Sequence, residues 1–351
     1  MKIADVRTVV VGNPWKNWIF VVVETDEGMV GVGEATGGSE TQPRVAAIEE
    51  IKHLVIGMNP RNIHEIFHKL YLSAFIRVTP AMAGIEMACW DIVGKTAGLP
   101  LYQLFGGYRN SVPCYVTCAY YRDGKDESEL RDELHKLKEQ GHRGFKAKVG
   151  GLSVSEDIER LEVVRDVIGD DRDLMVDVNR AWDLETAIAA AEAMLPVKPR
   201  WLEEPVRWQD DRRELKLLAQ RTNIPLSAGE SELTSYGCRA LLEEQAIQIL
   251  QFDCTMFGGF TQGRKMAALC ELNHVQIAPH HDCFIHAPLV ASSPSGCIVE
   301  SFTDPERDPL QAELFVNPPK IEDGWLTLNP DPGIGLTLSD DAIQKYGTSI
   351  L

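Results

Sequence analysis

The chain has 351 residues, 44% of them hydrophobic and 25% charged, which is typical of a globular protein that can bury a full core. Its formal net charge of −17 argues against nucleic acids and anionic membranes as partners, because both are polyanions. A small anionic substrate is compatible with this charge, since such a molecule responds to the local field of a metal ion and of lysines.

The first 110 residues are predicted to form an α+β domain. Alternating apolar patterns separated by Gly, Asn, Pro and Asp indicate a three-stranded antiparallel meander at residues 3–11, 18–25 and 30–34. Helical patterns follow at residues 42–56, 62–71 and 80–96. Glycines 106 and 107 and the Asn110-Ser111 pair mark the end of this domain.

From residue 112 the pattern alternates strictly between short β-rich runs and amphipathic helices. Eight such runs are found, at residues 112–119, 144–149, 174–178, 201–203, 226–229, 247–252, 275–278 and 298–302. Intervening helices are predicted at residues 127–140, 154–168, 184–194 and 211–221. This repeat predicts a modified TIM barrel of the (β/α)7β type over residues 111–315. The connection 284–296 is short, so we expect the last unit to be irregular.

The tail is rich in proline, glycine and aspartate, with a small strand predicted at residues 325–328. We expect residues 316–351 to pack back onto the first domain and complete it.

The eight cysteines are scattered, and no CxxC motif occurs. Several lie inside apolar runs, where a free cysteine behaves as a small hydrophobic residue. The chain opens on a strand pattern, and no apolar run approaches 18 residues. We therefore expect a reduced, soluble, cytoplasmic protein.

Polar residues stand at or near the ends of seven consecutive β-rich runs, 20 to 29 residues apart: Lys148, Asp177, Glu203, Glu230, Asp253, His280 and Glu300. That spacing corresponds to one strand, one helix and their loops. In a parallel barrel the carboxyl ends of the strands meet on one face, where the active site forms. The series therefore predicts that a lysine, several carboxylates and a histidine share one site.

Three carboxylates in successive units, Asp177, Glu203 and Glu230, suggest a Mg²⁺ site. Hard oxygen ligands suit Mg²⁺, and the absence of histidine or cysteine among them makes zinc less suitable. A single acidic residue after a strand is usually a helix cap or a loop residue. Three together need a cation, because unpaired carboxylates repel one another.

Lys146 and Lys148 lie two residues apart on one predicted strand and so face the same side. The proximity of like charges lowers the pKa of an amine, which makes a lysine usable as a general base. The alternative is a strand end carrying two solvated lysines.

Asp253 and His280 end neighbouring strands and are predicted to form a dyad that fixes the imidazole tautomer. His281 follows directly, so either histidine is a candidate base; His280 is favoured because it comes directly after Pro279. Glu300 lies within its strand, where a protonated carboxyl could donate to a developing oxyanion. The alternative for Glu300 is a buried partner of a barrel lysine.

As a set, these motifs resemble the enolase superfamily and, within it, the mandelate racemase subgroup. The matching segments are KAK at 146–148, DVN at 177–179, EEP at 203–205, GE at 229–230, FD at 252–253, PH at 279–280 and VES at 299–301. The resemblance covers essentially the whole chain, since this family places an α+β capping domain before its barrel.

The resemblance implies specific roles. It assigns Mg²⁺ to Asp177, Glu203 and Glu230, with Glu204 outside the metal ligands. It implies bases on opposite faces of the substrate, Lys148 on one and His280, oriented by Asp253, on the other. The remaining implied roles are substrate contacts for Lys146 and Asn179, adjustment of the Lys148 pKa by Lys146, and an electrophile at Glu300.

The shared step of this family is abstraction of the proton next to a substrate carboxylate. The expected outcome is loss of water from a sugar acid to give a 2-keto-3-deoxy acid, because residues 13–18 resemble a segment of galactonate-type acid-sugar dehydratases. A racemase or epimerase and a lactone cycloisomerase are the enzymatic alternatives. The non-enzymatic alternative is a metal-stabilised binding module. Trp15 and Arg77 are candidate specificity residues that equally suit packing between domains, and by analogy the family implies a homo-oligomer.

Overall fold

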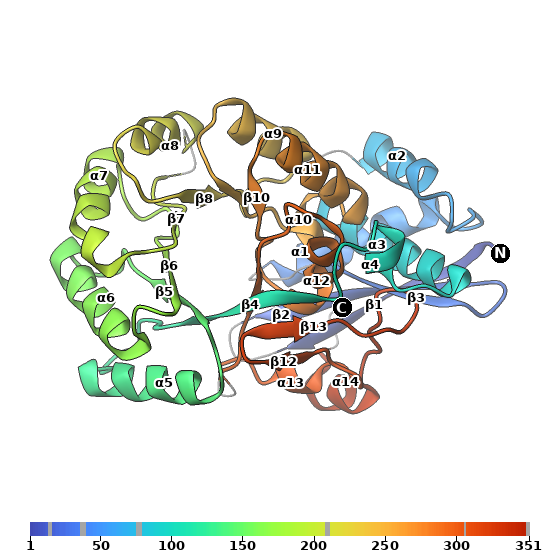
Figure 1. Cartoon of the computed structure of the whole chain (residues 1–351). Coiled ribbons are helices and arrows are strands. Elements are labelled where there is room, and N and C mark those ends of the chain that lie inside the picture. The colour runs from blue at the N-terminus through green and yellow to red at the C-terminus, as the bar shows by residue number, and fades with distance from the viewer. Residues whose placement is uncertain (13–15, 36–39, 75–78, 208–210, 305–306, 349–351) are drawn as a thin grey trace.

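An antiparallel sheet forms the first part of the capping domain in the computed structural model, which describes residues 1–12, 16–35, 40–74, 79–207, 211–304 and 307–348 (Figure 1). Its strands are β1 (Ile3–Gly12), β2 (Asn17–Thr25) and β3 (Val30–Glu34). The middle strand, β2, is buried along most of its length, as its nearly continuous apolar sequence predicts.

Four helices follow the sheet: α1 (Thr41–Ile51), α2 (Ile63–Ala74), α3 (Thr79–Ala97) and the single turn α4 (Leu101–Leu104). Helix α3 packs so closely on β3 that a Cβ atom at Gly31 or Gly33 would lie 2.1 Å from a backbone oxygen of α3. Only glycine fits at these two positions, which allows the helix to be buried on nearly all sides.

Eight strands line the barrel, and each of the first seven is followed by a helical segment (Figure 1). The strands are β4 (Ser111–Cys118), β5 (Gly144–Lys148), β6 (Asp173–Asp177), β7 (Trp201–Glu203), β8 (Leu226–Ala228), β9 (Ile249–Leu250), β10 (Gln276–Ile277) and β11 (Val299–Ser301). The helices are α5 (Glu127–Glu139), α6 (Val154–Ile168), α7 (Leu184–Ala193), α8 (Asp211–Ala219), α9 (Ser235–Glu243), α10 (Cys254–Phe257), α11 (Phe260–Leu272) and α12 (Cys283–Ser292). This arrangement confirms the predicted (β/α)7β order.

The strands β4 to β10 are joined in parallel, each to the next, and β11 pairs in parallel with β4. Between β10 and β11 no regular ladder forms. The amide of Ile277 donates to the carbonyl of Ser295 at 2.9 Å, and the amide of Cys297 donates to the carbonyl of Ile277 at 2.9 Å. These two bonds connect the ends of the open sheet.

The seventh connection differs from the expectation of an irregular unit, because it contains the helix α12. This helix is buried along nearly its whole length and includes Pro288. Proline removes one backbone donor, which weakens the helical signal in the sequence. Burial of the apolar side chains on all sides compensates for that loss.

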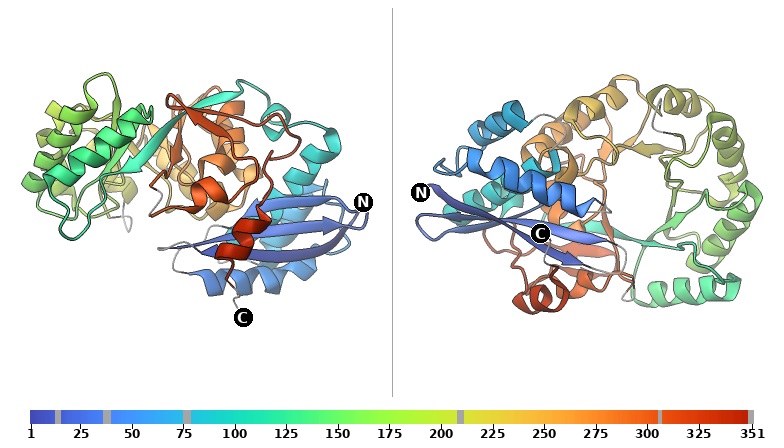
Figure 2. Two further views of the ribbon diagram at one scale, coloured as in Figure 1. Left: turned by 90° about the horizontal axis from the view of Figure 1, so that it is seen from below. Right: turned by 180° about the vertical axis from the view of Figure 1, so that it is seen from behind.

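The C-terminal tail returns to both parts of the molecule. Strand β13 (Trp325–Thr327) pairs with β12 (Lys320–Glu322) and with the start of β4. After the turn α13 (Leu310–Glu313), the last helix is α14 (Asp340–Tyr346), and Figure 2 shows it lying against the sheet of the capping domain. The amide of Thr348 donates to the carbonyl of Val10 at 3.0 Å, so the tail is bonded to β1. The proposed division at residues 110 and 315 stays a prediction.

A buried carboxylate links the capping domain to the barrel. Glu86 on α3 accepts hydrogen bonds from the backbone amides of Phe260 (2.8 Å) and Thr261 (2.9 Å), at the N-terminus of α11. It also accepts from the indole of Trp90 at 2.9 Å. A helix N-terminus leaves amides without intrahelical partners, so this carboxylate from another domain completes the start of α11. We call this contact the Glu86 contact.

All eight cysteines are free and buried, as the scattered apolar positions predict. Burial raises the pKa of several of these thiols, among them Cys118 and Cys254. Within the described residues, no helix is long and apolar enough to cross a membrane.

Candidate active site

Three neighbouring strands bring the predicted site residues to the same level of the barrel. The parallel register pairs Lys148 of β5 with Asp177 of β6, and Asp177 with Glu203 of β7. Each of these residues is the last of its strand, so all three lie at the carboxyl end of the sheet. This placement agrees with the site position that the barrel predicts.

Lys146 lies at the centre of a buried ionic network. Its ammonium is 2.7 Å from Glu300 Oε1, 2.8 Å from Glu203 Oε1 and 3.4 Å from Asp177 Oδ2, and the residue is only 1% exposed. Burial alone would lower the pKa of Lys146, but the carboxylates of Glu203 and Glu300 raise it well above its ordinary value. The Lys146 ammonium thus faces carboxylates, and its predicted effect on the pKa of Lys148 stays a prediction.

Lys148 occupies a more open position at the end of the same strand. Its ammonium donates to Asp177 and, at 2.9 Å, to the side-chain oxygen of Asn179. The amide of Asn179 in turn donates to Asp177 Oδ1 at 2.9 Å. Asn179 has a left-handed backbone (φ 46°), which turns the chain back over the end of β6. These contacts hold Lys148 at the wall of the site.

Glu300 on β11 is surrounded by donors. It receives hydrogen bonds from Lys146, from the hydroxyl of Thr117 and from the backbone amide of His281 at 2.9 Å. Burial alone would raise the pKa of Glu300, but the charges of Lys146 and His280 lower it to about 2. This lowered pKa favours an ionised carboxylate, the alternative of a buried partner for a barrel lysine. The role of Glu300 as an electrophile stays a prediction.

Asp177, Glu203 and Glu230 have the chemistry of a Mg²⁺ site. Burial and the neighbouring Asp177 carboxylate raise the pKa of Glu203 to about 7, with Lys146 opposing them and Glu230 adding to them. One oxygen of Glu230, Oε2, is buried and has no hydrogen-bond partner among the described residues. Carboxylates of which one raises the pKa of another fit a divalent cation, although Glu230 Oε2 also lies 3.6 Å from His280 Nε2.

The oxygens of these three carboxylates do not converge on a common metal position in this structure. In the part of the chain that the structure describes, no three His, Cys, Asp or Glu side chains are arranged to hold a metal ion as they stand. In this arrangement the Lys146 ammonium compensates the charge of Asp177 and Glu203. Glu204 is paired with Arg180 instead, with its Oε2 3.1 Å from Arg180 Nε.

Asp253 orients two histidines. His280 Nδ1 lies 3.3 Å from Asp253 Oδ2, as the dyad predicts, and His286 Nε2 lies 3.4 Å from Asp253 Oδ1. Burial alone would lower the pKa of His280, but Glu230 and the hydrogen bond to Asp253 raise it to about 9. His286 was not predicted; a single histidine inside the apolar run of α12 is the signal that could have identified it.

His281 differs from His280 in every contact. Its ring lies against the rings of Trp18 and Phe302, with centroids 5.6 and 5.4 Å away. No carboxylate is paired with it among the described residues, whereas His280 has Asp253 and, at 3.6 Å, Glu230. The geometry therefore favours His280 over His281 as the histidine of the dyad with Asp253.

A cavity of about 610 Å³ opens between these groups. Four of the predicted site residues line it: Lys148, Asn179, His280 and Glu300. His281 and Phe302 form another part of its wall. Lys146 is not among its lining residues, so its predicted contact with the substrate is not seen in this arrangement.

The capping domain adds Lys16 to the cavity wall. Its ammonium lies 3.9 Å from the centre of the Trp18 ring, and burial lowers the pKa of Lys16 to about 8 despite the nearby Glu34 and Asp282. The predicted specificity residues Trp15 and Arg77 lie outside the described residues.

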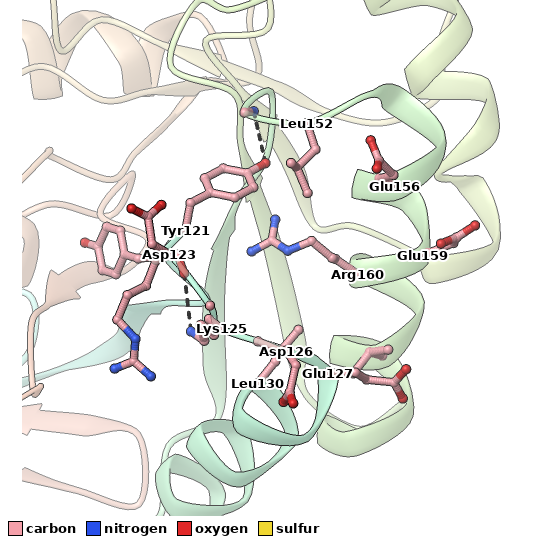
Figure 3. A pocket seen from close by; sticks show the side chains of 15 residues that line it. Tyr121, Asp123, Lys125, Asp126, Glu127, Leu130, Leu152, Glu156, Glu159 and Arg160 are labelled. Carbon is pink, nitrogen blue, oxygen red and sulfur yellow. Dashed lines mark hydrogen bonds between the residues drawn. The ribbon is translucent and has the colours of Figure 1, made fainter.

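A second cavity of about 740 Å³ adjoins the first on the side of α5 and α6 (Figure 3). The two share Tyr120, Tyr121 and Gly151. Figure 3 shows Tyr121 beside Arg160, whose guanidinium lies 4.1 Å from the centre of the ring. None of the predicted site residues lines this second cavity.

Comparison with known proteins identifies the family of this chain. Residues 129–342 match the model of the enolase C-terminal domain-like family, and residues 6–106 match the N-terminal domain of mandelate racemase and muconate lactonizing enzyme. Arabinonate dehydratase of Saccharolobus solfataricus is 30% identical over 92% of this chain and 89% of its own length. D-galactarolactone cycloisomerase of Agrobacterium fabrum is 30% identical over 93% of this chain and 90% of its own length.

Among solved structures, L-talarate dehydratase from Polaromonas sp. JS666, complexed with Mg and L-glucarate, superposes with a TM-score of 0.90. It is 30% identical to this chain and covers 99% of it, and the match covers 98% of that protein. These relatives are lyases and an isomerase, the two enzyme classes that the sequence predicts. Magnesium is the metal found in the family. The chain therefore belongs to the mandelate racemase and muconate lactonizing enzyme family of the enolase superfamily.

Proposed function

We propose that this protein is a Mg²⁺-dependent acid-sugar dehydratase. It would remove the proton next to the carboxylate of a sugar acid and then eliminate water, giving a 2-keto-3-deoxy acid. The observation that supports this most directly is the pair of basic side chains, Lys148 and His280, which border one cavity beside three carboxylates. The dehydratases among its relatives support the same reaction.

Asp177, Glu203 and Glu230 would hold the metal. Bound there, Mg²⁺ would supply the positive charge that stabilises negative charge developing on the substrate carboxylate. Lys146 adds a second fixed positive charge, because Glu203 and Glu300 keep its ammonium protonated.

Lys148 is the proposed base for the α-proton. In the structure its ammonium donates to Asp177 and Asn179, so its lone pair becomes available only when it gives up one proton. Asn179 fixes the direction of the side chain, which keeps the nitrogen at the cavity wall. A base held in position contributes about 10²- to 10⁴-fold to such a step.

His280 is the proposed acid. With a pKa raised to about 9, the imidazole is protonated at neutral pH and can donate to a leaving hydroxyl. Asp253 accepts from Nδ1, which leaves Nε2 as the nitrogen that delivers the proton. Loss of the α-proton to Lys148 and of hydroxide as water through His280 balances the elimination.

A protonated His280 also supports the alternative of racemisation or epimerisation, in which Lys148 keeps the α-proton and His280 delivers its own proton to the α-carbon from the opposite face. The first step is identical in both reactions. The product distinguishes them, because only elimination yields a keto acid.

Incubation of a panel of aldonic and aldaric acids with the protein and Mg²⁺ in D₂O tests the proposal. We expect exchange of the α-proton for one member and formation of a product that reacts with semicarbazide. Exchange with an inverted centre and no keto acid would support the epimerase. Absence of exchange across the panel, together with stabilisation by Mg²⁺, would support a binding module and contradict the enzymatic proposal.

A further inference from the structure

The ring of His281 is almost completely buried, with the residue 3% exposed, yet it borders the cavity that Lys148 and His280 also line. Trp18 of the capping domain and Phe302 after β11 lie against it. The ring is therefore held between aromatic side chains of both domains, with the cavity beside it.

Neither ring nitrogen of His281 has a hydrogen-bond partner among the described residues. A neutral imidazole carries one donor and one acceptor, and a buried polar group left unpaired costs about 1–3 kcal/mol. The other two histidines nearby are paired, His280 with Asp253 and His286 with the backbone amide of Cys254 at 3.0 Å. Of these three histidines, only His281 has unpaired ring nitrogens, and it is one of the residues that line the cavity.

The backbone fixes this ring in place. His281 has a left-handed conformation (φ 67°), and its amide donates to Glu300 Oε2 at 2.9 Å. Such a conformation is uncommon for residues other than glycine and persists where the surroundings hold it. Glu300 provides that support, so the position of the ring is determined by the site itself.

We propose that His281 is a positioning residue that hydrogen-bonds a hydroxyl of a polyhydroxy acid, at a carbon beyond the reacting centre. The inference rests on the proposed function and extends it, because it requires a substrate with a hydroxylated chain. His281 takes no part in proton transfer. Its protonated nitrogen donates to the oxygen of one substrate hydroxyl, and its unprotonated nitrogen accepts from another.

The donor and acceptor pattern of the ring favours hydroxyls over a second carboxylate at this position. A hydroxyl accepts from the protonated nitrogen or donates to the unprotonated one, so two hydroxyls of a polyol chain pair both nitrogens of a neutral imidazole. A carboxylate accepts only and would leave the unprotonated nitrogen without a partner. Lys16 and Arg307 bring positive charge to the same cavity, so the preference for hydroxyls rests on the two ring nitrogens.

The direct test is NMR of protein labelled with ¹⁵N in its histidine rings, with the His281 signals assigned by their loss in His281→Phe. Arabinonate, galactonate and glucarate are added in the presence of Mg²⁺, and binding is followed separately by thermal shift. We expect both His281 nitrogen signals to move with a bound acid. Binding without movement of these signals would overturn the inference and leave the proposed function intact. If no acid of the three binds, both fail.

Kinetics provide a second test on the acid that turns over. We expect His281→Phe to raise KM about 10-fold or more with a smaller change in kcat, because a hydrogen bond to the bound chain is lost. His281→Asn and His281→Gln each restore one nitrogen and should recover part of the loss. His135→Phe, the same substitution at an exposed position of α5, is the matched control. An equal KM for His281→Phe and His135→Phe would overturn the inference.

Discussion

Two of the contacts between the capping domain and the barrel differ in how their polar atoms are satisfied. At the Glu86 contact, the carboxylate receives hydrogen bonds from two backbone amides and an indole. At the cavity, Trp18 lies against His281, and the indole nitrogen of Trp18 and both nitrogens of His281 lack partners among the described residues.

This difference separates stability from function. A contact in which every buried polar atom is paired contributes to folding, and removing one member leaves the others unpaired. A contact that keeps polar atoms unpaired beside a cavity costs stability and remains available to a ligand. Substitutions near the cavity should therefore change turnover, and substitutions at the Glu86 contact should change the free energy of unfolding.

The largest effect is expected at the cavity. Lys148→Ala and His280→Asn should each lower kcat by about 10³-fold, since each removes a proposed acid or base, while Tm stays close to the wild-type value. Keto-acid formation measured with semicarbazide gives kcat. Lys136→Ala, on the exposed face of α5, is the control for loss of a lysine. Turnover retained in Lys148→Ala would assign the base to another residue.

The next largest effect is expected at the Glu86 contact. Glu86→Ala leaves the first two amides of α11 unpaired and removes one of the two acceptors of the Trp90 indole, so the free energy of unfolding should fall by about 3 kcal/mol or more. Urea denaturation measures this change. Glu50→Ala, at an exposed position of α1, is the matched control. Equal stabilities of the two variants would show that the contact is not a stabilising one.

Removal of the metal tests the third group, the carboxylates at the strand ends. A ligand that binds only the folded state at 100 times its Kd adds about 2.7 kcal/mol to stability. Mg²⁺ should accordingly raise Tm, and EDTA should reverse the rise. In Asp177→Asn the shift should disappear, whereas Lys148→Ala should keep it. A full Mg²⁺ shift in Asp177→Asn would place the ion elsewhere.

The smallest effect concerns pH at the Glu86 contact. Burial raises the pKa of Glu86 from 4.5 to about 7, although its hydrogen bonds oppose this shift. A raised folded-state pKa contributes stability that is complete below pH 4.5 and is lost as the pH rises through about 7.

Glu86→Gln cannot titrate, so the wild-type free energy of unfolding minus that of the variant isolates this group. We expect the difference to fall by about 2 kcal/mol between pH 5.5 and pH 8. Urea titrations of both proteins at several pH values measure it. A difference that stays constant over this range would mean that the pKa of Glu86 is not raised.

Much of the site was predictable because a parallel barrel imposes its own geometry. Once strands and helices alternate, the ends of neighbouring strands must lie together, and the pairing of Lys148, Asp177 and Glu203 follows from their place at those ends. The dyad of Asp253 and His280 follows from the same rule. Periodicity and spacing carry this information, and both are properties of the sequence.

Ionisation states were not predictable in the same way. Glu300 receives hydrogen bonds from three different elements, through Thr117, Lys146 and the amide of His281, and the charges of Lys146 and His280 lower its pKa. The raised pKa of Lys146 likewise depends on carboxylates from other strands. Such contacts depend on the rotamers and depth of side chains, which neither spacing nor hydrophobic pattern records.

The eight buried cysteines give this protein an internal reporter of its own opening. They are distributed over both domains, from Cys89 on α3 to Cys297 before β11, and a thiol shielded from solvent reacts only when its surroundings open. The rate at which a small alkylating reagent modifies each one under native conditions would therefore measure the free energy of local opening, position by position. No cysteine has to be introduced for this, so the opening rates of the capping domain and of the barrel can be measured separately in the unsubstituted chain.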